Sequence, residues 1–232
     1  MQAPEIARRV DWENIARLLV FSVLFLAPLL IAAAAPGGFL WFAAGGIVWA
    51  ISVAAKIPLA GFLHKGLGES ATSEALGVAH GVLSAACELG CAAACFVWYL
   101  ADGSVWTAAA FGAGAGWIEV VALLIPSLCS GAQGPESDEL PWHVRWTFLV
   151  ERTGAVIGHT GSRGLIWLAV IQNPWFALPA GIGFAIVDGL AVYGSVRKWE
   201  WFEWVIWSRF YGAVTTISVL ELLLFIGFAR GE

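Results

Sequence analysis

The chain has 232 residues, of which 59% are hydrophobic and 12% are charged, and its formal net charge is −5. A soluble domain of this length cannot bury so much apolar surface and still cover its outside with so few charges. The composition therefore excludes soluble enzymes and disordered tails and indicates an integral membrane protein, and the negative net charge argues against a nucleic-acid partner.

Seven apolar segments are long enough, at about 20 residues or more, to cross the hydrocarbon core of a bilayer as helices. In chain order they are residues 16–35, 39–63, 74–100, 104–128, 142–171, 174–194 and 204–229. Their apolar residues are continuous rather than alternating, which excludes a transmembrane β-barrel. The sequence therefore predicts one all-α membrane domain over residues 1–232, a bundle of about seven transmembrane helices in contact with the lipid bilayer.

Basic residues predict the orientation of this bundle, because cytoplasmic loops are enriched in Lys and Arg. One set of segment ends carries most of them, and only Arg230 lies at the other set. The basic residues of the first set are Arg8, Arg9, Arg17, Lys56, Lys65, Arg145, Arg197, Lys198 and Arg209. We expect a bacterial inner-membrane protein with its N-terminus in the cytoplasm and its C-terminus outside.

A second set of ionisable residues lies inside the apolar segments, where such side chains mark functional sites by default. The set comprises His80, Glu88, Glu119, Glu151, Arg152, His159, Arg163, Asp188 and Glu221. At a helical rise of about 1.5 Å per residue, Glu88, Glu119, His159 and Asp188 can share one layer near the membrane centre. The two arginines need carboxylate partners, and we expect Arg152 to pair with Glu119 or Glu151.

Arg152 and His159 are seven residues apart and therefore lie on nearly the same face of a helix. A carboxylate and this histidine could face one cavity, where a Glu with His support can activate water. A buried ion-pair network that only fixes helix packing explains the same spacing equally well. Three glycine pairs, Gly77 with Gly81, Gly112 with Gly116 and Gly154 with Gly158, predict close contacts between helices.

Cys87, Cys91 and Cys95 recur at four-residue spacing and form a stripe that could join His80 in holding a soft metal ion. The same spacing among many alanines is typical of a small-residue packing face. We favour the packing interpretation and expect no metal or other cofactor.

Four segments carry short motifs in a fixed order. They are residues 87–91 around Glu88, residues 112–119 ending in Ile118-Glu119, residues 151–159 from Glu151-Arg152 to His159, and residues 184–188 ending in Asp188. Together they resemble the YhfC family of glutamic-type intramembrane proteases, relatives of PrsW and of the CAAX-protease-like (CPBP) membrane proteins. The resemblance implies a hydrolase site in which Glu88, Glu119, Glu151 and His159 are catalytic and Arg152 and Asp188 form supporting ion pairs.

Several positions depart from the motifs of that family. Cys87 replaces the first Glu of a Glu-Glu pair, Cys91 stands where Arg is expected, and Ala115 and Phe184 each replace a His. Ala and Phe supply no proton relay or oxyanion donor. We therefore expect a degenerate protease that binds a membrane-spanning peptide or protein partner. The alternatives are an active peptidase, with Glu88 as base and His159 as helper, and a proton-coupled transporter or channel that uses the carboxylates.

Overall fold

The structure is a computed structural model that describes residues 12–68, 71–100, 103–129 and 140–229. The described residues form seven long helices, which confirms the predicted all-α class. These are α1 (Trp12–Ala34), α2 (Gly38–Leu67), α3 (Ser73–Cys95), α4 (Val105–Cys129), α5 (Trp142–Ile171), α6 (Ala177–Val196) and α7 (Trp204–Ala229). A π-helical turn, η1 (Phe96–Leu100), extends α3, and a 3₁₀ turn, η3 (Pro174–Phe176), precedes α6.

Six of the helices in the described part of the chain are long and apolar enough to cross a membrane, and α5 is the exception. Glu151, Arg152 and Arg163 interrupt the apolar character of α5. The bundle shields this helix from lipid, because every residue from 159 to 168 is buried. Neighbouring helices can therefore supply the polar partners that hydrocarbon cannot.

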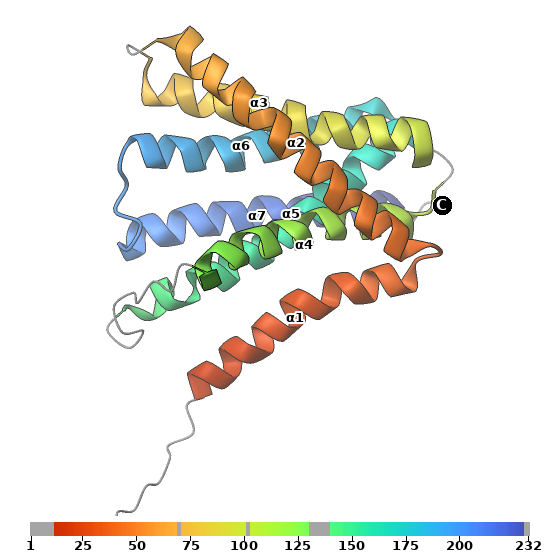
Figure 1. Cartoon of the computed structure of the whole chain (residues 1–232), viewed down its shortest axis with the longest axis horizontal. Coiled ribbons are helices and arrows are strands. Elements are labelled where there is room, and N and C mark those ends of the chain that lie inside the picture. Colours follow the sequence, from red (N-terminus) through yellow and green to blue (C-terminus); the bar gives the residue numbers. More distant parts are fainter. Residues whose placement is uncertain (1–11, 69–70, 101–102, 130–139, 230–232) are drawn as a thin grey trace, which may run out of the picture.

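Helix α5 packs between α4 and α7, while α3 packs mainly on α6 and α2 packs on α4. Figure 1 shows α1 at the edge of the bundle and α2 crossing it obliquely. The first turn of α1 and the last turn of α7 lie at opposite ends of the bundle, as an odd number of passes requires. An ion pair of 2.9 Å between Glu13 and Arg145 joins the first turns of α1 and α5 at one end.

Helices pack closely at the three glycine pairs for which the sequence predicts close contacts. A β-carbon added at Gly81 would lie 2.1 Å from the carbonyl oxygen of Ala185 on α6, and one at Gly116 would lie 2.7 Å from the Cα of Val156 on α5. At Gly158 the added atom would lie 2.8 Å from the Oγ of a serine on α7. The three glycine pairs are therefore confirmed as packing surfaces, which bring α3 to α6, α4 to α5 and α5 to α7.

Candidate functional site

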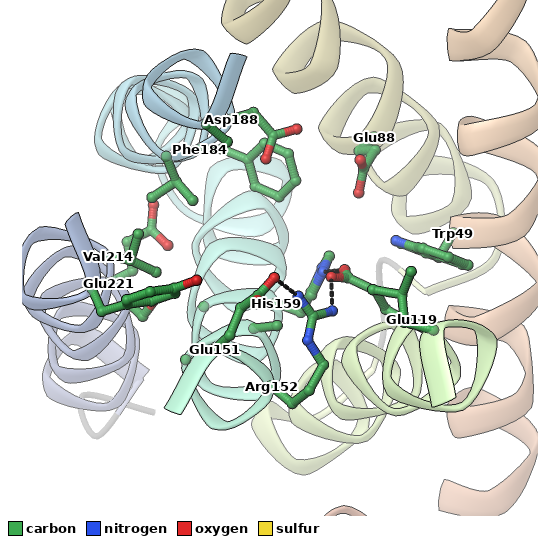
Figure 2. Close-up of a pocket in the computed structure, with 18 of the residues that line it drawn as sticks. Trp49, Glu88, Glu119, Glu151, Arg152, His159, Phe184, Asp188, Val214 and Glu221 are labelled. Carbon is green, nitrogen blue, oxygen red and sulfur yellow. Dashed lines mark hydrogen bonds and ion pairs between the residues drawn. The ribbon is translucent and has the colours of Figure 1, made fainter. Parts of the chain in front are cut away.

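A cavity of about 400 Å³ lies within the bundle, and side chains from all six helices α2 to α7 line it. The six residues that the sequence assigned to a site, Glu88, Glu119, Glu151, Arg152, His159 and Asp188, all line this one cavity. Figure 2 shows them converging from different helices. The four residues predicted to share one layer, Glu88, Glu119, His159 and Asp188, are thus brought together at one cavity.

Glu88 on α3 is the most enclosed carboxylate of the cavity, with 3% of its side chain exposed. Lys56 Nζ donates to its Oε1 at 2.6 Å, and Arg163 Nη2 donates to its Oε2 at 3.0 Å. The same ammonium donates to Ser84 Oγ at 2.9 Å and lies 3.5 Å from Oδ2 of Asp188. Ser84 Oγ also donates a hydrogen bond to Asp188. This network ties α2, α3, α5 and α6 together.

Lys56 corrects one interpretation of the sequence. The charge pattern predicts that Lys56 lies at a segment end, but it lies inside α2 and lines the cavity, so this prediction is wrong. A lysine near the end of an apolar segment usually extends along the helix to reach the membrane surface. Here the ammonium turns inward because two carboxylates, Glu88 and Asp188, offer closer compensation. Its position within the apolar segment was the signal that could have identified it.

Glu119 on α4 anchors a second network. Arg152 Nη1 donates to its Oε1 at 2.6 Å, while Nη2 of the same guanidinium donates to Glu151. His159 Nε2 lies 2.5 Å from the other oxygen, Oε2 of Glu119. Figure 2 shows the guanidinium between the two glutamates. The prediction that Arg152 pairs with a carboxylate is confirmed, and both expected partners are used.

Phe184 occupies the place where the family resemblance calls for a histidine. Its ring centroid lies 5.9 Å from that of His159 in an edge-to-face arrangement, and the Arg163 guanidinium carbon lies 5.5 Å from the same centroid. The phenyl ring supports its two neighbours by packing and by cation–π attraction. It adds no group that can carry a proton, and Ala115, at the other departure, is fully buried.

The His, Cys, Asp and Glu side chains of the described residues are not arranged to bind a metal ion. Within the residues that the structure describes, no group of three or more His, Cys, Asp or Glu side chains is placed to hold one. Cys87, Cys91 and Cys95 are partly buried free thiols on α3.

No protein-family model matches the chain, and neither a curated protein nor a solved structure matches it. The resemblance to the YhfC family consequently depends on the four motif segments and their order.

Proposed function

We propose that this chain is a membrane-embedded binding protein, related to intramembrane proteases of the YhfC type, that holds a membrane-spanning peptide or protein partner without hydrolysing it. The observation that carries the proposal is the engagement of both oxygens of Glu88 by Lys56 and Arg163. A general base must take a proton from water. Proton transfer to either oxygen would neutralise the carboxylate and weaken its ion pairs with Lys56 and Arg163, which opposes a role for Glu88 as the base.

The other candidate residues are engaged in the same way. Glu119 uses one oxygen for Arg152 and the other for His159. His159 is the single imidazole among the described residues that line the cavity. A proton relay through a second histidine is therefore missing where Ala115 and Phe184 stand, so the network supports helix packing better than hydrolysis.

The cavity nevertheless has the properties of a binding site. Its volume of about 400 Å³ falls within the range of about 300–1,000 Å³ that is usual for ligand pockets. Valine, alanine and aromatic side chains line much of it, among them Val53, Val187 and Phe210. Apolar walls with a few fixed polar groups favour binding of a mostly apolar molecule.

The proposal includes the orientation of the protein in a bacterial inner membrane, with the N-terminus in the cytoplasm and the C-terminus outside. Without Lys56, the basic residues at segment ends still favour one side. The Glu13–Arg145 pair joins the starts of α1 and α5, so these two helix ends lie on the same side, as the proposed topology requires.

A cross-linking experiment tests the binding and the hydrolysis together. A photoreactive residue replaces Val187, which lines the cavity, and a control carries it at Leu30, which is 69% exposed on α1. Both proteins are reconstituted in vesicles with labelled membrane-spanning peptides of about 20 apolar residues. We expect cross-links from position 187 above the level at position 30, and intact peptide throughout.

Three results would overturn this proposal. If no peptide cross-links at position 187 above the level at position 30, the proposed binding function is contradicted. Cleavage by wild-type protein that is lost in Glu88→Gln and in His159→Ala would establish the peptidase, because an acid–base group contributes about two to four orders of magnitude in rate. Proton flux into the vesicles that Glu88→Gln abolishes would establish the transporter.

A further inference from the structure

Glu221 on α7 differs from every other carboxylate that lines the cavity. Its side chain is 5% exposed, and its Oε1 has no hydrogen-bond partner in the described part of the chain. Glu88, Glu119, Glu151 and Asp188 each have a cation within ion-pair distance. Among the described ion pairs, Glu221 takes part in none. A buried carboxylate without a cation is unfavourable, so this side chain either holds a proton or binds a cation that enters the cavity.

The surroundings of Glu221 hold its carboxylate at the cavity. Gly183 on α6 makes room for it, because a β-carbon there would lie 2.2 Å from Glu221 Oε1. Arg163 attracts Glu221 electrostatically, but its guanidinium is bonded to Glu88 and Ser162. In Figure 2, Glu221 lies on the α7 side of the cavity, across from Glu119.

Carboxyl groups around the cavity outnumber the permanent cations bonded to them. Five carboxylates line it, and three permanent cations bond to them; the carboxylates are Glu88, Glu119, Glu151, Asp188 and Glu221, and the cations are Lys56, Arg152 and Arg163. A protonated His159 would add one positive charge. Even then, the cations are one fewer than the carboxyl groups, and Glu221 is the one without a bonded cation among the described residues, so a proton or a bound cation neutralises it.

The walls of the cavity favour an organic cation over a metal ion. Trp49, Phe210 and Tyr211 line the same cavity, and aromatic faces attract ammonium groups. A metal ion would need several oxygen, nitrogen or sulfur ligands, and the described residues offer no such group. An ammonium has three N–H donors, so the Glu221 carboxylate can satisfy it in part while its apolar carrier contacts the valine and aromatic walls of the cavity.

We propose that Glu221 binds a primary ammonium group that an apolar carrier brings into the cavity. The inference rests on the proposed binding function and names the chemistry that the bound molecule must carry. A lysine in the middle of a membrane-spanning peptide and a free alkylamine both present this group.

The test compares two labelled membrane-spanning peptides that differ at one central residue, Lys in one and norleucine in the other. The full-length protein in vesicles carries the photoreactive residue at position 187. We expect the Lys peptide to cross-link about tenfold more than the norleucine peptide, because a charge-assisted hydrogen bond contributes at least that factor. Glu221→Gln should remove the preference. Glu203→Gln, which changes an exposed carboxylate just before α7, should leave it intact.

Octylamine and octanol then distinguish the two sources of the ammonium. Displacement of the Lys peptide by octylamine and not by octanol shows that a free amine suffices. A Lys preference that octylamine does not affect shows that the peptide carrier is required. Thermal unfolding supplies a second readout, because a ligand that binds only the folded protein raises its melting temperature. Where a free amine suffices, octylamine should raise the melting temperature of wild type and not that of Glu221→Gln.

The outcomes separate this inference from the proposed function. Equal cross-linking of both peptides, or a preference that persists in Glu221→Gln, would overturn the ammonium site and leave the binding function intact. Cross-linking of both peptides at only the background level would contradict the ammonium site and the proposed binding function together. If Glu221→Gln does not fold, Glu221→Asp keeps the charge on a shorter side chain, and we expect it to weaken the preference; an unchanged preference there would contradict the proposal.

Discussion

Replacement of Arg152 by methionine should destabilise the protein strongly, because it leaves two carboxylates without their shared cation. The Arg152 side chain is 6% exposed, and that of its partner Glu119 is 20% exposed, so this pair is largely removed from water. Breaking such a pair by removing one member costs about 3–5 kcal/mol. The Glu151 side chain is 41% exposed, so the Arg152–Glu151 pair contributes only about 0–1 kcal/mol to the free energy of unfolding.

The contact between His159 and Glu119 limits the loss in free energy of unfolding that we expect for Arg152→Met. His159 still contacts Glu119 after the change and compensates part of its charge. We therefore expect a loss near the lower limit, about 3 kcal/mol in the free energy of unfolding, or about a hundredfold in the folding equilibrium. Adding Glu119→Gln to Arg152→Met removes the stranded charge. That double variant should regain about 2 kcal/mol relative to Arg152→Met alone.

Unfolding by sodium dodecyl sulfate in mixed micelles, followed by circular dichroism, measures these differences. Arg209→Met serves as a control, since Arg209 is exposed on α7 and its loss should change the free energy of unfolding by less than about 0.5 kcal/mol. A free energy of unfolding for Arg152→Met within about 0.5 kcal/mol of the wild-type value, as for a surface change, would contradict a buried ion pair at this position. A double variant no more stable than Arg152→Met would show that Glu119 is not the residue left unpaired.

Two further predictions concern packing and topology. Gly81→Ala should lower the free energy of unfolding by about 1–3 kcal/mol, because the added β-carbon would lie 2.1 Å from a backbone oxygen of α6. Gly90→Ala on the same helix is the control, because a β-carbon there meets nothing within 4 Å. This change should be neutral or slightly stabilising. Equal effects of the two changes would argue against the α3–α6 contact. Reporter fusions after residues 65, 102 and 232 should indicate cytoplasmic, external and external locations, and a cytoplasmic C-terminus would require an even number of passes.

Some features of this protein follow directly from its sequence. The lengths of the apolar segments predict the helices because a bilayer sets the minimum length of a span and requires internally satisfied backbone groups. The pairing of Arg152 is also predictable, because its guanidinium cannot lose its proton and lies in an apolar segment. The glycine pairs predict close packing because spacing by four residues places both on one side of a helix.

Only the tertiary structure decided which helices meet and which side chains compensate one another. The depth of a residue follows from the helical rise, but the rotation of each helix about its axis and the identity of its neighbours depend on packing across the whole bundle. Lys56 and Glu88 are 32 positions apart, and Arg163 and Glu88 are 75 apart. No local pattern predicts these contacts. Glu221 has no bonded cation among the described residues for the same reason, since the bundle brings the cavity's cations to other carboxylates and brings Gly183 to its side.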